Sequence, residues 1–287
     1  MTRVSDPSGA ARLRVVHLFP DLLNVYGDAG NVRTIVVRAE ARGLEVDIQS
    51  VVAGDPLVPD ADILLIGGGQ DREQESVARE LERLAPQIRT RLADGAALLA
   101  VCGGFQALGW SYGAATTRID GPGILDVRTE AGSKRLVGPV VAQPVAGDGL
   151  WPVDRTVIGF ENHSGRTILG EGTEPFARVE IGSGNNGDDG FEGLLARPGD
   201  GGLAGLRIGT YLHGPLLPRN PHIADGLIAW GLGRGREAVA LAPLDDSDEW
   251  SAHDRFEERC RRHRSREDRV PERVSRIIDP LRSLIGF

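Results

Sequence analysis

The sequence has few cysteines, a single lysine and no excess of positive charge. Its 287 residues include only Cys102 and Cys260 as cysteines, and 33 basic residues stand against 41 acidic ones, which gives a formal net charge of −8. Two cysteines are too few for a disulfide-based fold and suit a reducing compartment. The negative charge argues against a surface that neutralises phosphates. The cysteine count therefore disfavours a disulfide-rich secreted protein, and the net charge disfavours a nucleic-acid-binding protein.

A signal peptide and a membrane-spanning run are also missing. Residues 1–11 are polar and lack the apolar core of a secretory signal. The longest uncharged stretch, residues 95–117, contains five glycines and several polar side chains, which disfavours a transmembrane helix. We therefore expect a cytoplasmic protein that does not insert into the membrane.

The first hundred residues alternate strand and helix patterns. Helices are expected over about 32–43 and 73–93, and strands are expected at 13–18, 44–52, 62–66 and 96–101. This alternation is typical of a mostly parallel sheet with helices on both faces. The sequence therefore predicts an α/β fold with a doubly wound sheet.

The second half of the sequence carries shorter strand patterns and then changes composition. Strands are expected at 136–142, 156–160, 176–181 and 203–211, as an antiparallel or mixed extension of the same sheet. Asn220 and Pro221 predict the start of a helix. From about residue 245 to 287 the chain carries eleven acidic residues and ten arginines. We predict one domain over residues 1–244 and a charged tail over 245–287, either a solvated helix or extension or a segment that docks onto another chain.

Cys102 stands where an α/β protein presents a nucleophile. It follows an aliphatic strand and precedes two glycines and a short helical pattern. A side chain at such a turn projects at the carboxyl end of the sheet, and the helix amides lower the pKa of a thiol. An isolated cysteine is usually a small buried apolar residue, but these flanking features favour a nucleophile. Cys260, in the charged tail, has no such context and is interpreted as incidental.

A thiol nucleophile needs a base, and His213 is the preferred candidate. It follows a strand that ends near Gly209, so it is expected at the same sheet edge as Cys102. His163 is the competing candidate, and His17 is expected in the core. The other three histidines, in helix or tail, are expected to be solvated: His222, His253 and His263.

Backbone amides for an oxyanion are predicted at two glycine-rich turns. Gly68 and Gly69 belong to the triple glycine that ends a neighbouring strand, and Gly103 follows the cysteine. Such donors stabilise a tetrahedral oxyanion by about 3 kcal/mol each. The alternatives for the triple glycine are a plain turn or a phosphate-binding loop, but no Gly-Lys-Ser/Thr motif follows.

These features together resemble the class I glutamine amidotransferases, in the cobyric-acid-synthase-like branch, over roughly residues 13–235. Within the branch, the chain is similar to the glutaminase subunits of lipid II isoglutaminyl synthases. The resemblance rests on seven ordered blocks: 24–31, 66–74, 123–126, 135–138, 159–167, 184–186 and 209–215.

The resemblance implies the roles of the site residues. Cys102 would attack the side-chain amide of L-glutamine, and His213 would act as general acid and base. Arg135 matches the arginine that binds glutamine, and Gln106 matches a position that contacts substrate. The resemblance implies neither a metal nor a cofactor in this chain.

The resemblance also implies a partner. A MurT-like Mur ligase subunit would form a heterodimer with this chain and use ATP and magnesium. With the released ammonia it would amidate the D-glutamate of a membrane-borne lipid II precursor. The wider class carries His-x-Glu, whereas here Gly214 and Pro215 follow His213. The orienting acid would be dispensable, or come from elsewhere in this chain, or come from the partner, so we expect the isolated chain to be a poor glutaminase.

Three other functions are compatible with parts of the pattern. The nearest is the amidotransferase part of cobyrinate or cobyric acid synthesis, which usually accompanies an ATP-binding domain with a phosphate loop. A non-catalytic scaffold would not need Cys102 and His213 together. A cysteine peptidase or deglycase of similar fold would not need Arg135.

Overall fold

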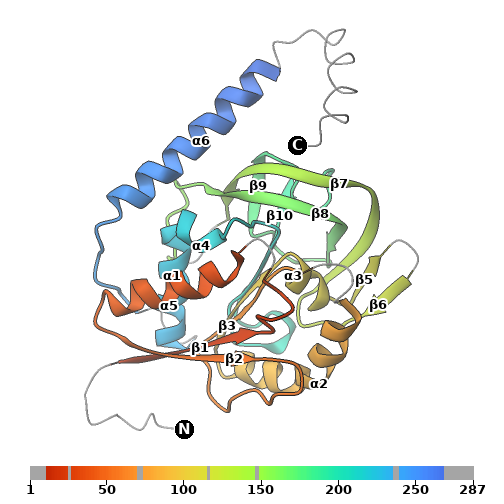
Figure 1. The fold of residues 1–287 in the computed structure, drawn as a ribbon, viewed down its shortest axis with the longest axis vertical. Coiled ribbons are helices and arrows are strands. Elements are labelled where there is room, and N and C mark those ends of the chain that lie inside the picture. The colour runs from red at the N-terminus through yellow and green to blue at the C-terminus, as the bar shows by residue number, and fades with distance from the viewer. Residues whose placement is uncertain are drawn as a thin grey trace.

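Two six-stranded sheets organise the computed structural model of the chain (Figure 1). The structure describes residues 11–24, 27–69, 74–114, 117–145, 149–234 and 239–267. The strand order of the first sheet is β11-β12-β4-β3-β1-β2, and the second sheet has the path β10-β9-β7-β5-β6 with β8 paired to β7. The two sheets meet where His213 forms an antiparallel backbone bridge with Phe160 of β8.

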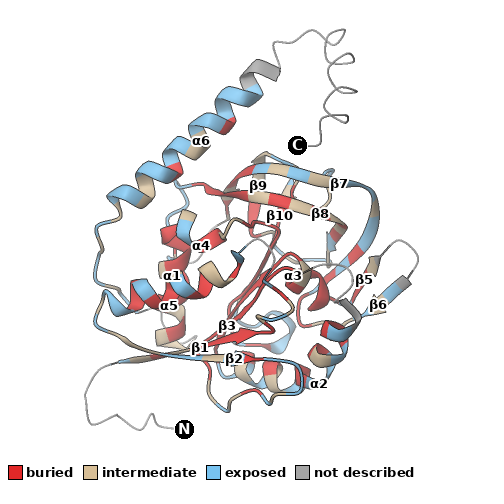
Figure 2. Ribbon diagram, in the orientation of Figure 1, coloured by how far each residue is buried: buried red, intermediate tan, exposed pale blue. Residues whose placement is uncertain are grey.

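The first sheet is the mostly parallel sheet that the sequence predicts. Its parallel strands are β1 (Arg12–Leu18), β2 (Glu45–Val51), β3 (Ile63–Ile66), β4 (Ala97–Val101) and β12 (Arg207–Thr210), and β11 (Leu194–Ala196) is an antiparallel edge strand. The central strands β3 and β4 are aliphatic and fully buried, as expected when helices cover both faces of a sheet. Figure 2 shows this buried layer across the middle of the molecule.

Helices cover the first sheet on both sides. Helices α1 (Ala29–Glu40) and α5 (Pro221–Gly233) contact each other and β1, whereas α2 (Gln74–Ala93) lies on the opposite side (Figure 1). The predicted fold class is confirmed. Short helical segments follow the strand ends: α3 (Gly103–Ala107), α4 (Leu216–Arg219) and a 3₁₀ turn over Asp200–Gly202. None of the described helices has the length and apolar character needed to cross a bilayer.

The predicted antiparallel or mixed extension of the first sheet in the second half of the chain is only partly right. Of the four predicted strands, the one near 203–211 joins the first sheet as β12, beside the antiparallel edge strand β11, and the other three belong to a separate sheet. That sheet contains β5 (Ser111–Ala114), β6 (Thr117–Asp120), β7 (Val127–Pro144), β8 (Val157–Leu169), β9 (Ala177–Ile181) and β10 (Phe191–Glu192). Along β8, buried and partly exposed residues alternate. This alternation belongs to an antiparallel sheet with one solvated face, which need not continue a sheet that is covered on both faces.

The predicted helix start at Asn220 and Pro221 is confirmed, but the Asn220 side chain does not cap the helix. It is fully buried and bonds the amide and the carbonyl of Ile158 in β8, as well as the carbonyl of Leu216. Asn220 therefore joins the second sheet to the α4–α5 connection.

Most of the described part of the tail forms one helix, α6 (Ser247–Glu267), which contacts α4, β7, β8 and β9. The expectation that His222 and His253 are solvated is wrong, because α6 packs against the rest of the chain. His222 of α5 and His253 of α6 itself are 6% and 1% exposed, and His222 stacks on Trp250 of α6. Burial lowers the pKa of His222 to about 3. His263 is exposed, as expected. The predicted tail beyond residue 267 lies outside the described residues.

Candidate active site

Cys102 sits at a strained strand-to-helix turn. It directly follows β4 and precedes α3, with φ 47° and ψ −103°, and its amide donates a hydrogen bond of 2.8 Å to the carbonyl of Thr210. A non-glycine residue with positive φ is costly and marks a constrained position. The same strained turn presents the nucleophile at the sheet edge in α/β hydrolases. The predicted turn geometry is therefore confirmed.

His213 lies just beyond β12, the strand beside β4, and its side chain is fully buried. Two backbone hydrogen bonds with Phe160, of 2.9 and 3.1 Å, hold it against β8. Its Nδ1 lies 3.3 Å from Oδ1 of Asp28, and the side chain of Cys102 is close enough to act on the charge of the imidazole. The structure thus brings together the cysteine and the histidine that the sequence pairs.

Asp28 completes this cluster, and the sequence analysis did not single it out. It lies in the loop between β1 and α1 and is 2% exposed. Its Oδ1 lies 3.3 Å from Nδ1 of His213, and its Oδ2 accepts a hydrogen bond of 2.7 Å from the amide of Gly68. A carboxylate of this chain therefore contacts the histidine that lacks a following glutamate.

The cluster favours a protonated His213. Burial alone would lower the pKa of His213, but its interactions with Asp28 and Cys102 outweigh burial and raise it to about 10. Because the folded-state pKa is raised above its ordinary value of about 6.5, the associated stabilisation is fully present below that pH and is lost as the pH rises towards 10. At neutral pH the imidazolium can donate a proton to a leaving group.

The glycine turn packs directly against the cysteine and the histidine. A Cβ on Gly68 would lie 2.6 Å from Cε1 of His213 and 3.2 Å from Cβ of Cys102, and a Cβ on Gly103 would lie 2.9 Å from the amide nitrogen of Gly69. Only glycine permits these approaches. The structure differs from the expectation for Gly68, because its amide already donates to Asp28. Gly69 and Gly103 stay the predicted oxyanion donors.

Replacing Gly68 by alanine should impair activity more than stability. The added Cβ must displace the imidazole of His213, and a displacement of about 1 Å in an active site can cost about 100-fold in rate. We expect Gly68→Ala to lower kcat/KM for glutamine hydrolysis at least tenfold. Gly138→Ala is the matched control, since a Cβ there meets nothing within 4 Å. Equal rates for the two variants would contradict the close packing at Gly68.

The two predicted substrate-binding residues lie apart from each other. Gln106 is buried one turn along from Cys102, and its Nε2 donates a hydrogen bond of 2.9 Å to the hydroxyl of Tyr211. Arg135 is exposed on β7 and donates to the side chain of Asn162 on β8. Asn162 lies two residues beyond Phe160, whose backbone pairs with His213. The Arg135 guanidinium is therefore carried by the strand pair that adjoins the histidine, although no contact joins Arg135 to Cys102.

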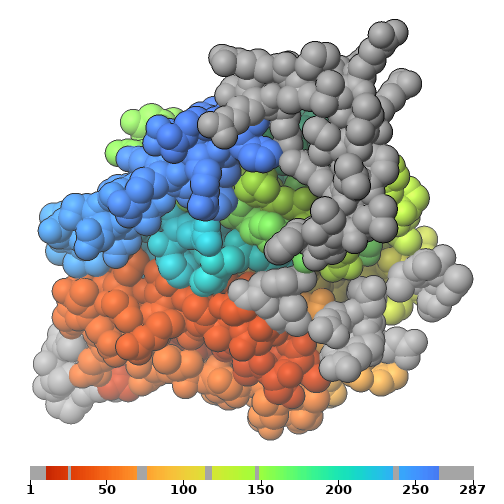
Figure 3. Space-filling view, turned by 45° about the horizontal axis from the view of Figure 1, so that its top comes forward, coloured from red at the N-terminus to blue at the C-terminus, as the bar shows by residue number. Residues whose placement is uncertain are grey.

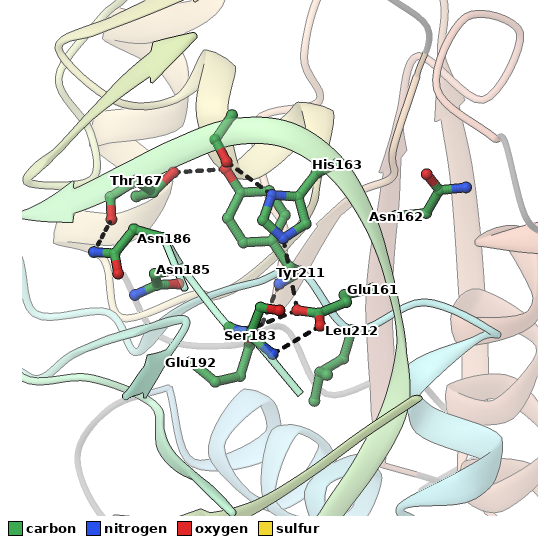
Figure 4. A network of polar contacts seen from close by, with 12 residues as sticks. Glu161, Asn162, His163, Thr167, Ser183, Asn185, Asn186, Glu192, Tyr211 and Leu212 are labelled. Carbon is green, nitrogen blue, oxygen red and sulfur yellow. Dashed lines mark hydrogen bonds and ion pairs between the residues drawn. The ribbon is translucent and has the colours of Figure 1, made fainter. Parts of the chain in front are cut away.

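A buried polar network links β8 with Tyr211 and with the segment around residues 183–186 (Figure 4). Glu161 accepts hydrogen bonds of 2.8 Å from the amides of Ser183 and Gly184, and Glu192 accepts from the hydroxyl of Thr210 and the amide of Tyr211. Burial raises the pKa of Glu192 to about 7. The network joins the second sheet to the segment between β12 and His213. Several of its residues belong to blocks 159–167 and 184–186 of the sequence pattern.

The competing histidines have other surroundings. His163 stacks on Tyr211 with ring centres 3.6 Å apart, and its Nδ1 lies 2.9 Å from the carbonyl of Gly165. His17 is 6% exposed inside β1, as expected of a core residue. His213 is therefore the histidine that the fold places against Cys102. No group of three or more His, Cys, Asp or Glu residues suited to a metal occurs among the residues that the structure describes.

A cysteine at a strand-to-helix turn, a histidine at the end of the adjacent strand and a glycine turn between them are the arrangement expected of a glutamine amidotransferase. The chain belongs to the CobB/CobQ-like glutamine amidotransferase family, whose model matches residues 14–221.

The chain is similar to curated members of this family. It is 37% identical over 218 residues to the lipid II isoglutaminyl synthase subunit GatD of Staphylococcus aureus, covering 75% of this chain and 83% of that protein. Identity to GatD of Streptococcus pneumoniae is 34%, covering 77% and 81% of the two chains. Identity to a cobyric acid synthase of Sphingopyxis alaskensis is 29%, covering 70% of this chain and 39% of that protein.

Proposed function

We propose that this chain is the glutaminase subunit of a lipid II isoglutaminyl synthase. The observation that carries the proposal is the similarity to GatD proteins over more than four fifths of their length. The cobyric acid synthase quoted above matches with lower identity than the GatD proteins and over 39% of its length, so cobyrinate or cobyric acid amidation is the second candidate. The pairing of Cys102 with His213 supports catalysis rather than a non-catalytic scaffold.

The reaction would proceed through a thioester. The Sγ of Cys102 attacks Cδ of glutamine, and the amide nitrogen leaves as ammonia with a proton supplied by His213. Water then adds to the thioester, the C–S bond breaks, and glutamate leaves as the thiol is restored. The amides of Gly69 and Gly103 are the proposed donors to the oxyanion in both steps. Arg135 can hold the α-carboxylate of glutamine through a bidentate ion pair.

The ammonia would pass to a MurT-like Mur ligase subunit in a cytoplasmic heterodimer. That subunit would bind ATP and magnesium and amidate the α-carboxyl group of D-glutamate in the lipid II stem peptide, for peptidoglycan synthesis and cell shape. This chain needs no cofactor for its own part of the reaction. Both relatives with the highest identity quoted above are named as subunits, which supports a partner of this kind.

The partner should raise glutaminase activity. In the isolated chain Asp28 holds the amide of Gly68, so the oxyanion lacks one of its predicted donors, and such a donor is worth about 100-fold in rate. We expect slow glutamate release from the isolated chain and a rise of at least about tenfold on adding the Mur-ligase-like subunit.

The test is glutamate release from L-glutamine, measured with and without the partner, together with ATP-dependent amidation of lipid II. An isolated chain as active as the complex would contradict the proposed activation. Amidation of a cobyrinate, but not of lipid II, would favour the second candidate. Absence of glutamate under both conditions, with Cys102→Ala indistinguishable from the wild type, would exclude a glutaminase.

A further inference from the structure

A cavity of about 610 Å³ lies between α4 and α6, outside the catalytic cluster. Figure 3 shows α6, in blue, against the cyan segment that contains α4. Its size falls within the range of small-molecule sites in proteins. The lining residues are Ile158, Pro218, Arg219, Ala252, His253, Arg255, Phe256, Arg259 and Arg262. Most of them belong to α6, which lies beyond the residues that the family model matches.

The charge of this cavity is of one sign. Four of the described lining residues are arginines and none is acidic, although the whole chain carries a net charge of −8. Arg255 and Arg259 have no hydrogen-bond acceptor within the described part of the chain, whereas Arg262 has an ion pair of 3.6 Å with Glu258. The guanidinium ions of such a group repel one another unless an anion lies between them.

The walls of the cavity are fixed by buried contacts. His253 is 1% exposed, with Nδ1 2.8 Å from the carbonyl of Arg219 and Nε2 3.0 Å from the hydroxyl of Thr156. Two helical turns further along α6, Cys260 is buried against Val141 and Ile158 of the second sheet. The arginines of α6 are therefore carried by a docked helix, so little conformational freedom of the backbone would be lost on binding a ligand.

Arg219 connects the cavity to the catalytic histidine. Its Nε donates a hydrogen bond of 3.1 Å to the carbonyl of Gly214, the residue after His213, and its guanidinium lies 5.0 Å from the centre of the Phe256 ring. Arg219 therefore both lines the cavity and bonds the turn that follows His213. A ligand held by its guanidinium would restrain the turn that carries His213.

We propose that the cavity between α4 and α6 binds a multiply charged phosphate anion and that its occupancy modulates the glutaminase site through Arg219. Guanidinium groups bind phosphate oxygens bidentately, and four of them match an anion with several charges. A free pyrophosphate and the polyphosphate of a nucleotide share this chemistry. The binding half of the proposal does not depend on lipid II as the acceptor.

The test is isothermal titration of the full chain with inorganic phosphate, pyrophosphate and ATP at low ionic strength. Pyrophosphate should bind saturably, and the double variant Arg255→Ala/Arg259→Ala should weaken its binding at least about tenfold. The matched control is Arg118→Ala/Arg128→Ala, which removes the same charge from exposed positions on β6 and β7 outside the cavity. Thermal unfolding of each variant checks that α6 stays docked.

Each outcome separates a specific site from its alternatives. Tighter binding of ATP than of pyrophosphate assigns a nucleotide, and equal binding assigns the free anion. Equal weakening in both double variants, or no saturable binding, overturns the site. Binding of an acidic polypeptide such as polyglutamate without binding of phosphates also overturns it, in favour of a protein-docking surface. A glutaminase rate that pyrophosphate changes in the wild type but not in the cavity variant supports the link through Arg219, and an unchanged wild-type rate overturns that link.

Discussion

Cys102→Ala should abolish glutamine hydrolysis while leaving the fold in place. Removal of a covalent nucleophile typically costs at least about 10⁴-fold in kcat, because no other group can form the thioester. The variant should also lower the pKa of His213, since the thiol is one of the two partners that raise it. Glutamate release and NMR titration of the imidazole measure these two effects separately.

Cys260→Ala is the matched control for this variant. Cys260 is also buried, but it belongs to α6 and packs against Val141 and Ile158 of the second sheet, and burial raises the pKa of its thiol. A neutral thiol is a poor nucleophile. We expect Cys260→Ala to retain wild-type kcat and to react with an electrophilic glutamine analogue at Cys102. Loss of activity in Cys260→Ala, with full activity in Cys102→Ala, would reverse the assignment of the nucleophile.

The central part of the fold could be predicted because its signals are local. The aliphatic strands β3 and β4 are uninterrupted apolar runs, and the expected limits agree with the observed ones to within about one residue. The second sheet could not be predicted in the same way. The first half of β7, residues 127–135, carries charged residues and lies mostly on the surface, so no apolar run marks it. Its pairing with β8 and β9 depends on contacts between distant segments, which strand patterns do not encode.

In the candidate site, too, the residues with local sequence signals could be predicted and those that depend on distant contacts could not. Cys102 and His213 could be paired from the sequence, because each follows a strand and parallel strands end at a common sheet edge. The connection of α6 to the core could not be predicted, because its buried residues, among them His253 and Cys260, are spaced among charged side chains. Asp28 could not be predicted either. It lies 185 residues before His213 and 40 before Gly68, and no local spacing relates the three.

Asp28→Asn should lower glutaminase activity by up to about 10⁴-fold, the loss that follows the same substitution of the orienting acid in a hydrolytic triad. The asparagine can still accept a hydrogen bond from the amide of Gly68, so the loop should stay in place. It cannot fix the tautomer of His213 or stabilise the imidazolium through a full charge. Because Asp28 helps to raise the pKa of His213 to about 10, the alkaline limb of the pH profile of kcat/KM should move to lower pH in the variant.

This shift distinguishes positioning of His213 from a merely structural role for Asp28. Asp62 provides the control, because it is also a fully buried aspartate but bonds Arg234 and the amide of Arg14 instead of a histidine. Asp62→Asn should reduce thermal stability and leave the pH profile unchanged. Asp28→Glu should restore part of the activity, since it returns a carboxylate to the histidine. A profile for Asp28→Asn that overlays the wild type would mean that His213 takes its orientation from another acid, and the partner subunit would then be the place to look for it.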